Sequence, residues 1–184
     1  MASRATTYIV LLRGINVGGN RKVPMADLRT LLEDAGAENV TTYVQSGYAV
    51  LTSTASAASL RTTIEGKLQE RFGFHVDVMV RSIAELKKVI AANPYGDAAS
   101  DPTKVHVVFL NDKPKAADVA AIDQAAFAPD ELTARGREIY LCLPNGAGRS
   151  KLAGVLERKI KVPATARNWR TVTTLLELAE AAGT

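Results

Sequence analysis

The chain has 184 residues, of which 47% are hydrophobic and 5% aromatic, and its formal net charge at pH 7 is +4. This composition can bury a core and excludes a disordered or fibrous chain. The longest apolar run near the start, residues 8–12, is too short for a signal sequence or a membrane span. The single cysteine, Cys142, rules out an internal disulfide, so we expect a cytoplasmic protein without a membrane segment.

Basic residues concentrate in two segments. Residues 149–170 carry seven Lys or Arg against the single Glu157, and residues 1–29 carry five against Asp27. Two basic regions point to an anionic partner, either a nucleic acid or a phosphorylated small molecule, and ordinary solvated surface is the alternative.

The first half of the chain has the pattern strand, helix, strand, strand, helix, strand. Apolar periodicity indicates helices that end before Gly36 and Gly73, and Ser46-Gly47 has the composition of a hairpin turn. This order is the split β-α-β arrangement of a ferredoxin-like fold. The predicted strands are 8–12, 40–45, 48–53 and 75–81, and the predicted helices are 24–35 and 60–72.

The same order restarts beyond a linking helix at 82–92. Strands are predicted at 104–110, 131–134, 138–143 and 162–166, and helices at 115–127, 150–160 and 169–182. Hairpins and helices recur at an offset of roughly 90 residues, which indicates an internal duplication. The predicted class is therefore α+β, with two tandem ferredoxin-like (βαββαβ) halves and antiparallel sheets. The halves span 1–82 and 103–184, with a linking helix and loop over 83–102 and a final helix.

Five stretches of the sequence resemble the bacterial domain-of-unknown-function family 1697. They are Arg13-Gly14-Ile15-Asn16-Val17-Gly18-Gly19, Thr42-Tyr43-Val44-Gln45-Ser46-Gly47, Asn93-Pro94, Gly148-Arg149-Ser150-Lys151-Leu152 and Thr165-Ala166-Arg167-Asn168-Trp169-Arg170-Thr171. The resemblance covers nearly the whole chain. It implies a tandem of ferredoxin-like units and brings no established activity. Tyr48 is a departure, because the family usually has Asn after Ser-Gly, so any ligand contact of that Asn would be altered here.

Three loops supply the candidate ligand-binding residues. The loop 13–23 joins a strand to a helix and could bind an anion through backbone N–H groups and nearby cations. It is neither a P-loop nor a dinucleotide-binding loop, and its glycines could instead serve only a turn with positive φ. The candidate set is Arg13, Gly14, Asn16, Gly18, Gly19, Ser46, Arg149, Ser150, Lys151, Arg167, Asn168 and Trp169.

The other two loops place cations at predicted helix starts. Ser150 and Asn168 are the expected N-caps, and a bound anion would relieve the unfavourable interaction of Arg149 and Lys151 with the helix dipole. Extension of these side chains into water is equally consistent. Trp169 could stack on a base or anchor the last helix in the core. If the loops form one site, Arg13, Arg149 and Arg167 should face one cleft.

The sequence predicts no catalytic or metal-binding group and no cofactor. His75 and His106 have no Cys or carboxylate at ligand spacing, and Cys142 fits a packing role in a strand. Ser46 has no adjacent base. The strand Ile9–Leu12 is apolar on both faces, which indicates that the second face of the sheet is covered. An enzyme acting on a phosphorylated or carboxylated metabolite and a structural or protein-interaction role remain alternatives, and the oligomeric state stays open.

Overall fold

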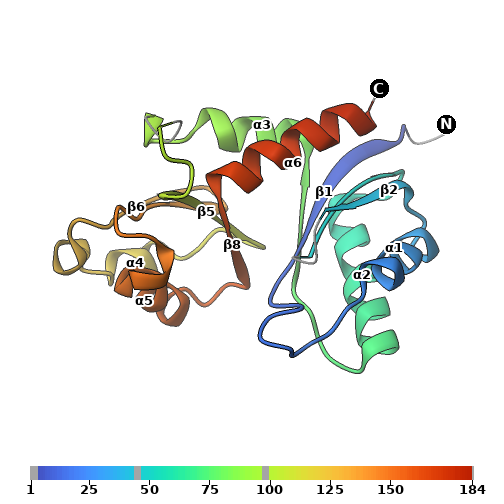
Figure 1. Cartoon of the computed structure of the whole chain (residues 1–184), viewed down its shortest axis with the longest axis horizontal. Helices are drawn as coiled ribbons and strands as arrows, with labels where there is room; N and C mark the ends of the chain where they lie inside the picture. Colours follow the sequence, from blue (N-terminus) through green and yellow to red (C-terminus); the bar gives the residue numbers. More distant parts are fainter. Residues whose placement is uncertain (1–3, 44–46, 97–99, 184) are drawn as a thin grey trace. The chain divides into compact units, whose positions relative to one another are not determined.

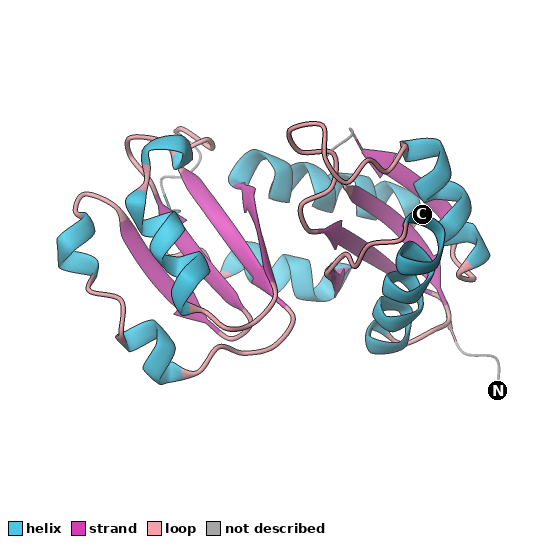
Figure 2. Cartoon of the chain, turned by 90° about the horizontal axis from the view of Figure 1, so that it is seen from below, coloured by secondary structure: helices cyan, strands magenta, loops and turns pink. Residues whose placement is uncertain are grey.

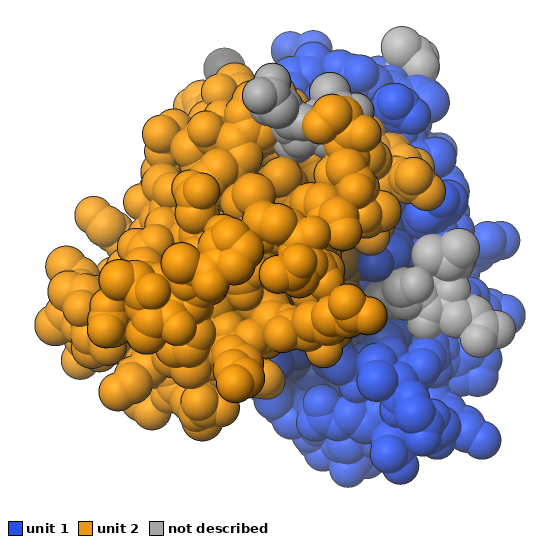
Figure 3. All heavy atoms as spheres, turned by 60° about the vertical axis from the view of Figure 1, so that its left-hand side comes forward, with its two compact units in different colours: residues 1–87, 175–184 blue, residues 88–174 orange. Residues whose placement is uncertain are grey.

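The computed structural model describes residues 4–43, 47–96 and 100–183. The chain divides into two compact units, which Figure 3 shows in different colours. Unit 1 comprises residues 1–87 together with 175–184, and unit 2 comprises residues 88–174. Unit 1 is therefore built from two separate stretches of the sequence.

Unit 1 contains one antiparallel sheet with the strand order β2-β3-β1-β4. Its elements follow the order strand, helix, strand, strand, helix, strand (Figure 1). They are β1 (Thr6–Leu12), α1 (Met25–Asp34), β2 (Glu38–Tyr43), β3 (Tyr48–Ser53), α2 (Ala57–Phe72) and β4 (Val78–Ser82).

Unit 2 repeats this topology with the strand order β6-β7-β5-β8. Its elements are β5 (Val105–Leu110), α4 (Ala116–Ala120), η2 (Gln124–Phe127), β6 (Glu131–Arg135), β7 (Glu138–Cys142), η3 (Ala147–Arg149), α5 (Lys151–Lys159) and β8 (Ala164–Asn168). Two further helices, α3 (Ile83–Ala91) and α6 (Trp169–Ala182), contain the points at which the chain passes between units. The predicted class, two tandem ferredoxin-like halves, is confirmed.

The duplication extends to individual backbone hydrogen bonds. Two bonds at the end of β1 have counterparts at the end of β5: Leu12 N to Gly47 O (2.9 Å) and Arg13 N to Asp77 O (3.0 Å) in unit 1, and Leu110 N to Arg137 O (2.9 Å) and Asn111 N to Pro163 O (3.1 Å) in unit 2. The first strand of each unit is thus tied at the same point to its two neighbours. Each unit serves as an internal comparison for the other.

In each unit the helices that connect the strands pack against one face of the sheet (Figure 2). In unit 1 the core side chains of α1 and α2 recur at helical spacing, which explains why these segments form amphipathic helices. They are Leu28, Leu31 and Leu32 from α1 and Leu60, Ile64 and Leu68 from α2. In unit 2 the corresponding cluster includes Leu152 and Leu156 from α5 against Val108 and Leu110 of β5.

The central strand β1 is buried on both of its faces. Val10 and Leu12 belong to the helix-covered core, and Ile9 and Leu11, which point to the other side, are each 1% exposed. This confirms that the second face is covered. The central strand of unit 1 therefore has no open face on which bases could stack, as they do in RNA-recognition domains.

The largest departure from the predicted elements lies at 115–127. The expected helix ends at Ala120, and a short 3-10 turn over Gln124–Phe127 follows after the extended residue Asp123. The alanine-rich segment has little apolar surface to bury, and Ile122, which is buried, fixes the chain where the helix breaks. The Gln124 side chain then accepts a hydrogen bond from Leu132 N at 3.1 Å.

Most strands also differ from their predicted bounds by one to three residues, and two examples are the last strands of the two units. The strand predicted at 75–81 begins only at Val78, and the one predicted at 162–166 runs over Ala164–Asn168. No helix in the described part of the chain combines the length and the apolar character that a membrane crossing requires.

Candidate functional site

The loop between β1 and α1 is a small hairpin. Asn20 N donates to Val17 O at 3.0 Å, and Gly18 and Gly19 between them have φ values of 59° and 76°. Two successive residues with positive φ make the tight turn in which glycine is favoured. The two glycines therefore determine the conformation of the tip, whatever else they do.

Asn16 closes this hairpin at its base. Its Nδ2 donates to Val23 O at 2.9 Å, its Oδ1 accepts from Val23 N at 2.8 Å, and its backbone N donates to Arg21 O at 3.1 Å. Asn16 itself has a φ of 55°, a conformation that Asn tolerates better than most residues. The Asn16 amide thus fixes the shape of the loop that carries Arg13 and Arg21.

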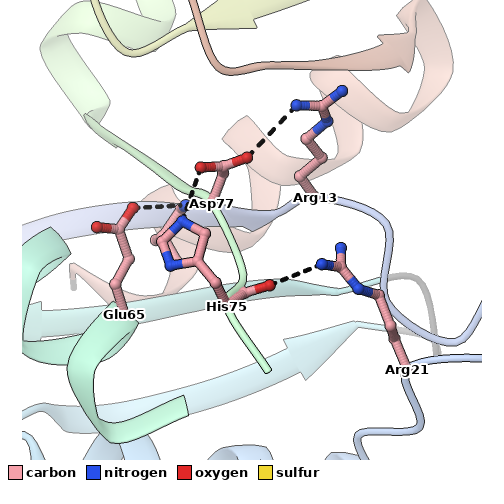
Figure 4. Close-up of polar contacts among 6 residues, drawn as sticks. Arg13, Arg21, Glu65, His75 and Asp77 are labelled. Carbon is pink, nitrogen blue, oxygen red and sulfur yellow. Dashed lines mark hydrogen bonds and ion pairs between the residues drawn. The ribbon is translucent and has the colours of Figure 1, made fainter. Parts of the chain in front are cut away.

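Both arginines of the loop reach the segment 75–77, which precedes β4 (Figure 4). Arg13 Nη1 lies 3.4 Å from Asp77 Oδ2, and Arg21 Nη2 donates to His75 O at 2.9 Å. His75 Nε2 lies 3.0 Å from Asp77 Oδ1, so the two oxygens of one carboxylate contact an arginine and a histidine. We refer to Arg13, Arg21, His75 and Asp77 as the loop site.

The side chains of the loop site are held in place and remain accessible. The guanidinium carbon of Arg21 lies 5.6 Å from the centroid of the Phe74 ring, a cation–π contact that adds to its hydrogen bond. The side chains of Arg13 and His75 are 38% and 60% exposed. The neighbouring Glu65 accepts a hydrogen bond at its Oε1 from Val78 N at 3.0 Å (Figure 4). An anion could therefore reach the arginines from solvent.

The sequence interpretation missed His75 and Asp77. It set His75 aside for lack of a carboxylate at ligand spacing, whereas Asp77 lies within hydrogen-bond distance. Residues two apart in an extended segment point to the same side, and Val76 and Val78, which alternate with them, are buried. That alternation was the signal that could have identified the pair.

In unit 2, strand register brings the other two candidate loops to one end of the sheet. Val105 at the start of β5 pairs with Cys142 at the end of β7, and His106 pairs with Asn168 at the end of β8. Because β5 lies between the other two strands, those two ends are about 10 Å apart. The loop after β7 and the start of α6, which follows β8 directly, therefore both lie at this end.

The predicted helix caps in these loops are confirmed. Ser150 Oγ accepts from Ala153 N at 3.1 Å, and Asn168 Oδ1 accepts from Thr171 N at 2.9 Å. Both side chains thus satisfy backbone N–H groups that the first turn of a helix leaves without an intrahelical partner.

The cations of these loops differ in their surroundings. Arg149 and Lys151 are exposed, whereas Arg167 Nη1 donates to Thr165 Oγ1 and, at 2.8 Å, to Ala166 O in its own strand. Trp169 is half-buried. Arg13 belongs to unit 1 and Arg149 and Arg167 to unit 2, so their expected common cleft stays a prediction.

The hairpin between β2 and β3 carries the remaining candidate. Ser46 lies outside the described residues. Tyr48, where the resemblance implies an Asn, is 8% exposed and stacks on Tyr43 with 6.4 Å between ring centroids. Residue 48 is thus a packing residue in this chain.

Other titratable side chains show the effects of burial. Burial, with Glu131 and Asp130 adding to it, raises the pKa of the Cys142 thiol, so the thiol is protonated at neutral pH. Burial also lowers the pKa of His106. Among the described residues, no three His, Cys, Asp or Glu side chains are grouped as metal ligands would be.

Comparisons with known proteins agree with this architecture. No curated protein matches the chain. The structure of the conserved bacterial protein SP0830 from Streptococcus pneumoniae is similar, with a TM-score of 0.73 and 24% sequence identity over 96% of this chain and 99% of that chain. At this identity the similarity shows the fold alone. The family model described as "Protein of unknown function (DUF1697)" matches residues 5–140, and the chain therefore belongs to that family.

Proposed function

We propose that this protein binds an anionic small ligand carrying a phosphate or carboxylate group, and that the loop site is where it binds. The observation that carries the proposal is that Arg13 and Arg21 extend from a hairpin closed by Asn16 and are both held at the segment 75–77. A guanidinium group has five N–H donors, and its planar fork matches phosphate and carboxylate oxygens. Arginines fixed before binding lose less conformational entropy when a ligand arrives.

The internal duplication supports this choice. Residues 13–24 connect β1 to α1, whereas the shorter segment 111–115 makes the corresponding connection from β5 to α4. The backbone bonds around the two connections are equivalent, so the fold forms without the longer hairpin. The fold does not require the extra residues of the loop in unit 1. Binding of a ligand would explain why they are present.

The tip of the hairpin could contribute further donors. In the part of the chain that the structure describes, the backbone N–H groups of Gly18 and Gly19 donate to no acceptor. Exposed N–H groups in tight turns form favourable sites for anions.

The test is isothermal titration calorimetry with inorganic phosphate, a nucleoside diphosphate and citrate. Arg13→Gln with Arg21→Gln should weaken binding of the phosphate-bearing or carboxylate-bearing probe by tenfold or more. Arg29→Gln, which removes an exposed cation of α1, is the control and should bind like the natural sequence. Absence of binding to all three probes, or an equal loss in the control, would overturn the proposal.

A second candidate function is acid–base catalysis on the bound ligand, favoured by the contact of His75 with Asp77. A carboxylate beside Nε2 keeps the proton on that nitrogen and leaves Nδ1 to act as a base. Nδ1 would accept a proton from water as the water oxygen bonds to the phosphorus of a phosphate ester and the ester oxygen leaves. His75→Gln should then abolish hydrolysis of p-nitrophenyl phosphate without weakening phosphate binding. Equal hydrolysis by the variant would remove this candidate.

The proposal includes a cytoplasmic location, supported by a single cysteine where exported proteins often carry disulfides. Cell fractionation with a specific antibody tests this, and recovery in a membrane or extracellular fraction would contradict it.

A further inference from the structure

The outer face of α5 and its flanks form a cationic surface on unit 2. The segment 149–161 contains five Lys or Arg and a single carboxylate, Glu157. The cations are all exposed, and none of them is in an ion pair within the described chain. They are Arg149, Lys151, Arg158, Lys159 and Lys161, and we call them the α5 surface.

Helical geometry aligns part of this surface. Lys151 and Arg158 are seven residues apart, so they lie on the same side of α5, separated by about 10 Å along its axis. Gly154 lies between them, and Arg158 Nη1 is 3.7 Å from where a Cβ of Gly154 would be. The two cations thus flank a position without a side chain, while Leu152 and Leu156 face the core.

Helix stability does not account for all of these charges. Lys161 Nζ donates to Arg158 O at 2.9 Å, which satisfies a carbonyl at the end of α5, where positive charge is favourable. Arg149 and Lys151 lie at the opposite end, where positive charge is unfavourable by about 0.3–1 kcal/mol. Arg149 and Lys151 therefore do not stabilise α5, and their positive charge has another role.

Unit 1 shows that the fold does not need this surface either. α2 occupies the same place in the topology as α5, between the third and fourth strands of its unit. Over its longer span α2 mixes both signs of charge: Arg61, Lys67 and Arg71 with Glu65 and Glu70. Two equivalent helices with different outer faces indicate that the charge of α5 is related to a partner.

We propose that the α5 surface binds the sugar–phosphate backbone of a duplex nucleic acid without reading its sequence. A row of cations facing closely spaced phosphates releases condensed counterions, which is the main source of such binding. The large apolar side chains that the described chain exposes are Val17 and Tyr43, both in unit 1. The α5 surface therefore lacks the apolar residues that insert into membranes and the aromatic rings that stack on single-stranded bases.

This surface shares no residue with the loop site and belongs to the other unit, so the two proposals can fail independently. Fluorescence anisotropy with a labelled 20-base-pair DNA duplex, the equivalent RNA duplex and the single strand measures binding at 50 and 200 mM salt. The test variant is Lys151→Gln, Arg158→Gln, Lys159→Gln. The control variant is Arg29→Gln, Lys113→Gln, Lys115→Gln, which removes the same charge from exposed positions outside the α5 surface.

We expect duplex binding that weakens with salt, and a loss of tenfold or more in the test variant. In the test variant the slope of log affinity against log salt concentration should become shallower by about 2–3. Each phosphate contact contributes about 0.9 to this slope, and the variant removes three cations. The control should retain most of the affinity, and the loop-site variant Arg13→Gln, Arg21→Gln should also retain it. Equal losses in test and control variants, tighter binding of the single strand, or binding only to phosphatidylserine vesicles would overturn the proposal.

Discussion

Gly47 leaves room for Ile15. A Cβ atom on residue 47 would lie 2.9 Å from Ile15 Cγ1, closer than Cβ atoms approach their neighbours in proteins, and 3.2 Å from the Cβ of Leu12, which is tighter than most such contacts. Ile15 is 2% exposed and belongs to the hairpin that carries the loop site. Gly47 and the loop after β1 therefore pack closely because residue 47 has no side chain.

Gly47→Ala should destabilise the protein and disturb the loop site. The residue has a φ of 78°, which an alanine adopts only with strain, and the added methyl group must also displace Ile15. We expect a loss of about 2–4 kcal/mol in the free energy of unfolding, measured with urea.

Gly73→Ala is the matched control, because Gly73 has a φ of 76° and nothing within 4 Å of its Cβ position. Gly73→Ala should lower the free energy of unfolding only by the cost of placing alanine at a positive φ, about 1 kcal/mol. If the two substitutions have equal effects, the contact between residues 47 and 15 is not what requires glycine.

Asn16→Ala should weaken ligand binding while leaving Arg13 and Arg21 in the sequence. The substitution removes both hydrogen bonds to Val23, so the hairpin loses the contacts that fix its shape. Two neutral hydrogen bonds correspond to about 1–3 kcal/mol of stability. Calorimetric titration with the bound probe should show a weaker affinity and a less favourable entropy. Asn20→Ala, which leaves these bonds intact, should bind normally; an unchanged affinity in Asn16→Ala would contradict the role given to this side chain.

The protein should lose stability at alkaline pH because the buried Tyr140 hydroxyl then loses its proton. Its hydroxyl donates to Val89 O at 2.7 Å, and burial raises its pKa from 10.0 to about 12. Because the unfolded chain loses this proton at lower pH, the stabilisation is complete below pH 10 and is lost as pH rises toward 12. The loss should be on the order of 2–3 kcal/mol.

Tyr140→Phe tests this pH dependence. The variant should be less stable by about 1–2 kcal/mol at pH 7, because Val89 O loses its donor, and its stability should fall less between pH 10 and 12. Urea unfolding at pH 7, 10 and 11 measures both effects. Parallel pH profiles for the two proteins would assign the alkaline transition to other groups.

Arg81 should be sensitive to truncation. It is the largest of the fully buried side chains, 1% exposed in β4, and its Nη1 donates to Val80 O at 3.0 Å. Arg81→Ala removes a buried hydrogen-bonded charge and leaves a cavity, so we expect a loss of about 3–5 kcal/mol. Arg81→Met, which keeps most of the volume, should lose less. A loss below about 1 kcal/mol in the alanine variant would contradict this account.

The parts of the fold that follow local rules could be predicted from the sequence. The strand at 48–53 matches its prediction because a continuous apolar run is bounded by glycine and serine, and Asn168 caps α6 as its position before Trp169 indicated. The helix predicted at 115–127 failed because alanine propensity could not compensate for a missing apolar face.

The candidate site was predictable only in part. The loop 13–23 stood out for its glycines and cations, but its contact with His75 and Asp77 links residues far apart in the sequence through the pairing of β1 with β4. No local pattern encodes such a contact. The glycines also have a conformational role, since Gly18 and Gly19 form the turn itself, and their contact with an anion stays a prediction.

The division of unit 1 into two stretches has a consequence for synthesis on the ribosome. Residues 88–174 emerge between the two stretches, so unit 2 can fold while unit 1 still lacks residues 175–184. The late stretch includes the second half of α6, where Leu175 and Ala179 are buried and Glu180 pairs with Lys87 at 2.7 Å. Until residues 175–184 are synthesised, the nascent unit 1 exposes apolar surface that the finished protein covers. We expect a chaperone to bind unit 1 during this interval.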